Sequence, residues 1–210
     1  MPHLKTVWSA KESGWALWKI TETEDELAKL ASPEICPKEI ISGNKKLEWL
    51  AGRALMKRLI ESIGQSFNGI KKDEFGKPYL INLSHQVSIS HSYPYVAIQI
   101  DSHKDVGIDL EQPKKKLLKI AHRVLDPVEL EDAGTNEVKH CVYWCAKEAL
   151  YKIYGKRGLS FSENLKISPF ELETEGRLKA EVRISETSIH ATLKYQVSDD
   201  FVLVFTDTEG

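Results

Sequence analysis

The segment Trp144-Cys145-Ala146-Lys147-Glu148-Ala149-Leu150-Tyr151-Lys152 predicts the central helix around which the second half of the chain is built. It contains strong helix formers and neither glycine nor proline. Glu148 and Lys152 are four residues apart, so a helix places them on one face. Trp144 and Tyr151 are seven residues apart and mark an apolar side that can pack inward. Taken alone, such a charged pair is most often an ordinary surface pair.

A second acidic element lies upstream, in Val106-Gly107-Ile108-Asp109-Leu110-Glu111. Apolar residues alternate with the others at period two, which predicts a strand, and Asp109 and Glu111 therefore point to the same face. Two carboxylates aimed together repel each other. A divalent cation with oxygen ligands, such as Mg²⁺, relieves that repulsion, and Glu148 is a candidate third ligand. The spacing leaves open the alternative that both acids lie on the solvated face of an edge strand.

Composition bounds the class of protein. The 210 residues suffice for one large domain or two small ones, and 41% apolar with 29% charged residues is an ordinary soluble mixture. A net charge of −2 does not indicate binding to nucleic acid. We find no signal-peptide pattern and no stretch of about 18 apolar residues, so we expect a cytoplasmic chain that neither binds nor spans a membrane. The three cysteines, Cys36, Cys141 and Cys145, are expected to be free thiols.

The order of the elements predicts an α+β fold made of two similar halves. Hydrophobic periodicity predicts a long helix in each half, at about 37–63 and 135–155, with shorter helices at about 21–32, after 113 and after 126. Each long helix is expected to pack on an antiparallel sheet, so that a duplicated architecture is inferred from element order alone. The N-terminal half is placed at 1–104 and the C-terminal half, carrying the metal site, at 105–210. The predicted strands are 5–8, 15–20, 87–90, 95–100, 106–111, 164–167, 177–184, 188–197 and 201–205.

A second set of side chains suits phosphate. Lys77 lies in a turn that Pro78 makes rigid, and Ser90 and His91 come where a strand ends. Alone, Lys77 reads as a solvated loop lysine, and His91 is as well explained as a turn histidine bonded to local backbone. Together, four side chains could bind several phosphate oxygens, with arginine offering a bidentate fork: Arg53, Lys77, His91 and Lys152.

Viewed together, these segments resemble the 4′-phosphopantetheinyl transferases of the longer, surfactin-synthetase type. The matches follow the family's order. Position 145 is often a hydroxyl-bearing or small residue in this motif, and we expect Cys145 to change packing rather than chemistry. The matching segments span about half of the chain and are Glu48-Trp49-Leu50-Ala51-Gly52-Arg53, Gly76-Lys77-Pro78, Ile89-Ser90-His91-Ser92, Gly107-Ile108-Asp109-Leu110-Glu111 and Trp144 to Lys152.

The resemblance implies a pseudo-two-fold pair of α+β halves with coenzyme A in the cleft between them. It also implies transfer of the phosphopantetheine arm to a serine of a carrier protein, with release of adenosine 3′,5′-bisphosphate. Asp109, Glu148 and Glu111, the last directly or through water, would hold Mg²⁺, and Lys152 would face the pyrophosphate. Glu148 is also the candidate general base, and its two roles compete. The 3′-phosphate and adenosine end would lie against Arg53, Lys77, Pro78, Ser90 and His91.

The partner implied by the resemblance is an apo acyl or peptidyl carrier protein, and the pathway, fatty-acid, polyketide or peptide synthesis, stays open. Carrier proteins are typically acidic, and the basic run from Lys114 to Arg123 would speed their encounter. A solvated helix face explains any single lysine of this run equally well. A monomer is expected, because two halves of one chain supply the cleft. The alternatives are a magnesium-dependent hydrolase of nucleotides or phosphodiesters and a non-catalytic module that binds coenzyme A.

Overall fold

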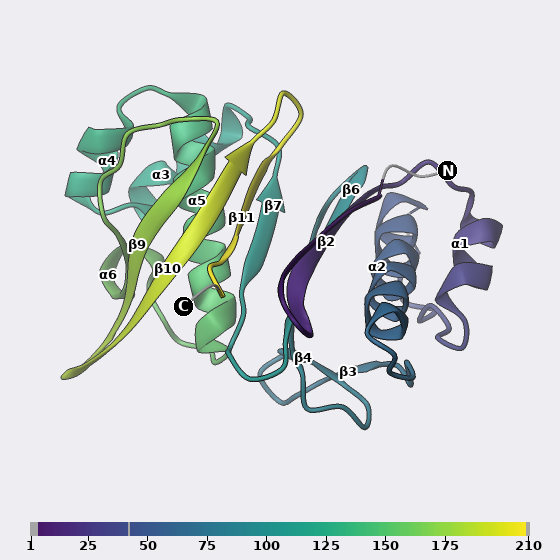
Figure 1. Ribbon diagram of the computed structural model, residues 1–210. Helices are drawn as coiled ribbons and strands as arrows, with labels where there is room; N and C mark the ends of the chain where they lie inside the picture. The colour runs from purple at the N-terminus through teal and green to yellow at the C-terminus, as the bar shows by residue number, and fades with distance from the viewer. Residues whose placement is uncertain (1–3, 42, 209–210) are drawn as a thin grey trace. The chain divides into compact units, whose positions relative to one another are not determined.

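Two compact units make up the chain in this computed structural model, which describes residues 4–41 and 43–208 (Figure 1). The first unit runs to Asp105 and the second from Val106 to Thr208. Each unit has its own hydrophobic core. Within the described residues, no helix is both long and apolar enough to cross a bilayer.

The N-terminal unit packs a long helix, α2, on a four-stranded antiparallel sheet with the order β1-β2-β6-β5. A two-stranded ribbon, β3-β4, accompanies this sheet, and α1 packs on α2. The elements of this unit are β1 (Leu4–Ala10), β2 (Ser13–Lys19), α1 (Glu24–Ala31), α2 (Gly43–Ser62), β3 (Ile70–Lys72), β4 (Pro78–Leu80), β5 (Gln86–Ser92) and β6 (Tyr95–Asp101).

The two helices of this unit follow from local sequence, with one correction. Thr23 and Glu26 form a capping box that starts α1, as its acidic first turn predicts. Sequence periodicity predicts a start of α2 near residue 37, but the helix begins at Gly43. Ile35 and Ile41 are 87% and 88% exposed, so these two side chains give little burial that would stabilise earlier helical turns.

The C-terminal unit packs α5 on a five-stranded antiparallel sheet with the order β7-β11-β10-β9-β8. Asn136 caps the start of α5 by accepting from the backbone N of Lys139, and Gly155 ends the helix at φ 68°. The elements are β7 (Ile108–Glu111), α3 (Lys116–Val124), α4 (Pro127–Ala133), α5 (Glu137–Tyr154), α6 (Phe161–Asn164), β8 (Leu165–Ile167), β9 (Glu175–Ile184), β10 (Thr187–Val197) and β11 (Val202–Thr206).

The two units share a strand order around their long helices. In the first unit, β2 precedes the helices and pairs antiparallel with the last strand, β6, which pairs with β5. In the second unit, β7 precedes the helices and pairs antiparallel with the last strand, β11, which pairs with β10. The predicted α+β class, with a long helix on an antiparallel sheet in each half, is confirmed. The pseudo-two-fold relation between the halves stays a prediction.

Gly107 allows α5 to lie unusually close to the start of β7. A Cβ atom at this position would lie 2.0 Å from the backbone O of Ala149 on α5. The Gly107 N also donates to Thr206 Oγ1 at 2.8 Å, and Thr206 N donates back to Gly107 O at 3.0 Å. Any side chain here would push the helix from the strand, so the glycine sets how near the residues of β7 come to those of α5.

Candidate active site

Asp109 and Lys152 form the best-defined contact among the predicted site residues. Asp109 lies on β7 and is 7% exposed, and Lys152 lies in the last turn of α5. Lys152 Nζ donates to Asp109 Oδ1 at 2.8 Å and to the backbone O of Ile108 at 2.8 Å. The strand and the helix therefore meet through a charge-assisted hydrogen bond at the position where the sequence predicts an ion site.

Glu148 lies one turn before Lys152 and is half-buried. Burial and, to a smaller extent, the nearby negative charge of Asp109 raise the pKa of this carboxyl, Lys152 opposes both, and the resulting pKa is about 7. Within residues 4–41 and 43–208, the structure gives Glu148 neither a hydrogen bond nor an ion pair. A half-buried carboxylate that faces a second carboxylate suits either proton transfer near neutral pH or a cation.

Glu111 contacts residues other than Asp109 and Glu148, and its role as a metal ligand stays a prediction. Its carboxylate accepts from the backbone N of Gln112 at 2.9 Å and lies 3.5 Å from Lys116 Nζ. Strand alternation gives Glu111 the same side as Asp109, but its side chain turns toward the start of α3. Across the part of the chain that the structure describes, no three His, Cys, Asp or Glu side chains are grouped so as to hold a metal ion.

Arg53, the predicted phosphate-binding arginine, lies on α2 between an aromatic ring and an acid. Its guanidinium carbon is 4.2 Å from the centre of the Trp49 ring, and its Nε is 3.7 Å from Glu34 Oε2. The Nε atom is buried and makes no hydrogen bond. Burial lowers the pKa of Arg53, and the charge of Glu34 opposes that change. The guanidinium therefore keeps hydrogen-bonding capacity that Glu34 does not use.

His91 and Lys77 each contact a carboxylate of the same unit. His91 Nδ1 lies 3.1 Å from Glu48 Oε2 on α2, and the ring is about half exposed. Burial acts to raise the pKa of Glu48, but hydrogen bonds from His91 and from the Tyr93 N hold it below its usual value. Lys77 Nζ donates to Asp105 Oδ1 at 2.6 Å.

The predicted phosphate-binding residues therefore divide between the two units. Ser90 is buried on β5, and Pro78 begins β4. Arg53, Lys77 and His91 each contact a different carboxylate of the N-terminal unit. Lys152 and the predicted acids lie in the C-terminal unit.

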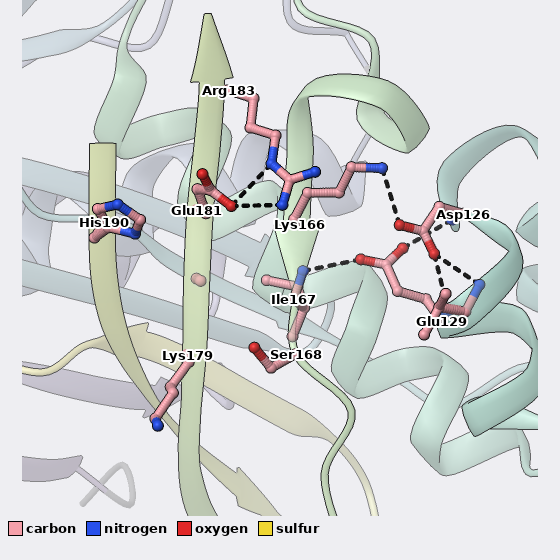
Figure 2. A pocket seen from close by; sticks show the side chains of 11 residues that line it. Asp126, Glu129, Lys166, Ile167, Ser168, Lys179, Glu181, Arg183 and His190 are labelled. Atoms are coloured by element: carbon pink, nitrogen blue, oxygen red, sulfur yellow. Dashed lines mark hydrogen bonds and ion pairs between the residues drawn. The ribbon is translucent and has the colours of Figure 1, made fainter. Parts of the chain in front are cut away.

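A cavity of about 470 Å³ in the C-terminal unit is lined by none of the predicted site residues. It lies between the start of α4 and the strands β8, β9 and β10 (Figure 2). Its charges are largely matched in pairs, since Lys166 bonds to Asp126 at 2.9 Å and Arg183 to Glu181 at 2.9 Å. The chemistry of the candidate site lies instead on β7 and α5.

The sequence analysis missed one buried ion pair in this unit. Lys147 is fully buried and Glu129 is 1% exposed, with 2.5 Å between Lys147 Nζ and Glu129 Oε2. A signal was present, because a helix places Lys147 beside the apolar positions Tyr143 and Leu150. A lysine surrounded by such residues must have a buried partner.

The cysteines behave as expected. All three are free thiols, and Cys145 is fully buried with its Sγ atom 3.9 Å from the backbone O of Val202. Burial raises the pKa of Cys145 well above that of an ordinary thiol, with Cys141 and Asp109 as the neighbouring groups. The thiol is thus held in its neutral form within the core, which agrees with a packing role.

Comparison with known proteins supports a relationship for the C-terminal unit. Residues 105–206 match the sequence model of the 4′-phosphopantetheinyl transferase superfamily. The chain is also similar to a 4′-phosphopantetheinyl transferase of Bacillus subtilis, with 37% identity over 95 residues. This alignment covers 41% of the present chain and 41% of the relative, so the chain spans less than half of that protein. Residues 105–206, which include Asp109, Glu148 and Lys152, are therefore similar to the 4′-phosphopantetheinyl transferase superfamily.

Proposed function

We propose that the protein transfers the 4′-phosphopantetheine arm of coenzyme A to a serine hydroxyl of an apo carrier protein and releases adenosine 3′,5′-bisphosphate. The observation that carries this proposal is the half-buried Glu148, with a pKa of about 7, beside Asp109 and Lys152. It lies in the unit that matches the superfamily. The surfactin-synthetase type, the cytoplasmic location and the monomeric state are part of the same proposal.

The acids of this unit suit Mg²⁺. Their oxygens are hard ligands, and the charge of Asp109 raises the pKa of Glu148, so a cation bound by both carboxylates would relieve their repulsion. Mg²⁺ is commonly held by one or two carboxylates, with waters and substrate phosphates completing its shell. Asp109 and Glu148 would hold it, with Glu111 as a further ligand directly or through water. When bound, the ion would neutralise charge that develops on the pyrophosphate.

The chain's own side chains then account for the proton and the leaving group. Glu148 is the candidate base for the proton of the carrier's serine, a role that competes with its role as a Mg²⁺ ligand, and a pKa near 7 is well matched to neutral pH. The serine oxygen bonds to the phosphorus that carries pantetheine, and the bond from that phosphorus to the oxygen of adenosine 3′,5′-bisphosphate breaks. Lys152 donates to a pyrophosphate oxygen, where its positive charge offsets the negative charge of the departing group.

The nucleotide end of coenzyme A is assigned to residues of the N-terminal unit. Arg53 offers an Nε–H group without a hydrogen bond, and His91 is about half exposed. Lys77 contributes a cation, while Pro78 and Ser90 contribute the turn and a hydroxyl. Because Arg53, Lys77 and His91 already contact carboxylates, phosphate would bind by exchange of partners.

The proposed docking surface for the carrier protein is the basic helix α3. Leu117, Ala121 and Val124 bury one side of this helix in the core. The opposite side carries exposed cations that include Lys119 and Arg123. An acidic carrier would be steered toward this side of α3 by long-range attraction.

The test is mass spectrometry of apo fatty-acid, polyketide and peptidyl carriers incubated with the chain, coenzyme A and Mg²⁺. We expect one carrier to gain phosphopantetheine, and we expect Asp109→Ala to abolish the gain. A carrier whose serine is replaced by alanine is the matched control. Breakdown of coenzyme A without a carrier would instead identify a hydrolase. Calorimetric binding of coenzyme A without any turnover would identify a binding module.

A further inference from the structure

Lys147 connects α5 to three other segments of the C-terminal unit. Its ammonium group is fully buried and donates to backbone oxygens of Val124 at 2.9 Å, Phe161 at 3.0 Å and Leu165 at 2.8 Å. Its charge is balanced by Glu129. The three carbonyls belong to the last residue of α3 and the first residues of α6 and β8. One side chain therefore fixes the end of the basic helix to the middle of α5.

Glu129 extends this connection to α4 and β8. Its Oε2 atom accepts from the backbone N of Asp126 at 2.8 Å, and its Oε1 atom accepts from the backbone N of Ile167 at 2.9 Å. Figure 2 shows the Glu129 side chain lying between these two segments. Together the two side chains contact the end of α3, the N-cap of α4, the first residue of α6 and the strand β8.

Stability alone is a weak reason for such a pair. Removing two charges from water carries a large desolvation cost, and buried ion pairs can often be replaced by apolar side chains without loss of stability. An apolar pair would fill the space but would leave the carbonyls of Val124, Phe161 and Leu165 without a shared donor. What only the ammonium provides is a fixed geometry among these segments.

The position of Lys147 in the sequence relates that geometry to the candidate site. It directly precedes Glu148 on α5. On the side of α5 that faces β7, Gly107 sets the approach to Ala149. Lys147 sets the approach to α3 through Val124. Contacts on two sides therefore determine where Glu148 lies relative to the basic helix.

We propose that Lys147 is a positioning residue that fixes the position of α3 relative to Glu148, so that a carrier docked on α3 presents its serine to this carboxylate. The inference rests on the proposed function and adds a role that neither the acids nor the basic helix supplies. Lys147 touches neither substrate; it acts through the placement of Glu148 and α3.

The test compares Lys147→Met with Lys139→Met. Lys139 is a matched control, because it lies on the same helix, is 9% exposed and bonds to Asp132 of α4 at 2.9 Å. Both variants are assayed well below their thermal midpoints. Since misplacement by about 1 Å can cost about 100-fold, we expect kcat/KM for the carrier to fall by about that factor in Lys147→Met. We expect the KM for coenzyme A to be unchanged in Lys147→Met, and wild-type kinetics in Lys139→Met.

A second variant, Lys147→Met with Glu129→Leu, separates positioning from stability. With both charges gone, the thermal midpoint should rise above that of Lys147→Met, because no unpaired charge stays buried, while kcat/KM for the carrier should stay low. Recovery of both quantities, or wild-type kinetics in Lys147→Met, would overturn the inference and leave the proposed function intact. A wild-type chain that transfers nothing to any carrier would overturn the proposed function and the inference with it.

Discussion

Replacing Gly107 by alanine should damage both the stability of the C-terminal unit and its chemistry. The new Cβ would lie 2.0 Å from the Ala149 O, 2.8 Å from the Ala149 C and 3.0 Å from Ile153 Cγ1. Two of these atoms are backbone, so no side-chain rotation relieves the contact. To restore even 3.0 Å, α5 must move from β7 by about 1 Å. Overpacking costs about 1–3 kcal/mol, and a backbone clash belongs at the upper end.

The matched control is Gly52→Ala, which adds the same methyl group inside a helix of the N-terminal unit. Its nearest contacts are Ile89 and Val96 at 3.9 Å, so it should stabilise α2 by about 0.5–1 kcal/mol. A loss of about 3 kcal/mol should lower the thermal midpoint of a unit of this size by about 12 °C or more. The displacement should lower phosphopantetheine transfer by about 100-fold. A Gly107→Ala protein with wild-type melting and transfer would refute the close helix–strand approach.

Three further predictions concern charge. The pKa of Glu148 is about 7 in the folded chain, above its unfolded value, so its contribution to stability is full at low pH and is lost as pH rises through 7. Glu148→Gln should therefore raise the thermal midpoint at pH 8 but not at pH 4, and it should abolish transfer. An unchanged thermal midpoint at pH 8 would contradict the raised pKa of Glu148. Chelation should stop transfer, and Mg²⁺ should raise the wild-type thermal midpoint by mass action; the same rise in Asp109→Ala would remove Asp109 from the ion site. Lys119→Glu should raise the KM for an acidic carrier, most strongly at low salt, and leave kcat at saturation unchanged; loss of kcat instead would count against a docking role for α3.

Sequence periodicity predicted the helix and strand that hold the candidate site. In β7 and α5, apolar spacing, an asparagine cap and a terminal glycine all agree, so local and tertiary preferences point to the same structure. The same rules placed the start of α2 too early. Near Ile41 the composition permits a helix, but the side chain of Ile41 is 88% exposed and gives such a helix little burial.

Side-chain partners were harder to predict than elements. Strand alternation gives the side on which Glu111 lies but not the direction of its carboxylate, which Lys116 and Gln112 determine. The same holds for Lys147, because its three carbonyl acceptors come from Val124, Phe161 and Leu165, which no short-range pattern brings together. Long-range contacts of this kind depend on tertiary packing.

The pairing of Lys152 with Asp109 has a consequence for how ligands bind and leave. The carboxylate already has a positive neighbour before any ligand arrives, so binding replaces one contact by another and its free energy is a difference between two similar contacts. An affinity set in this way stays moderate even though the individual charges are strong. In the proposed transfer, departure of the products would let the lysine return to the acid, and the resident pair would thereby favour repeated turnover over tight retention.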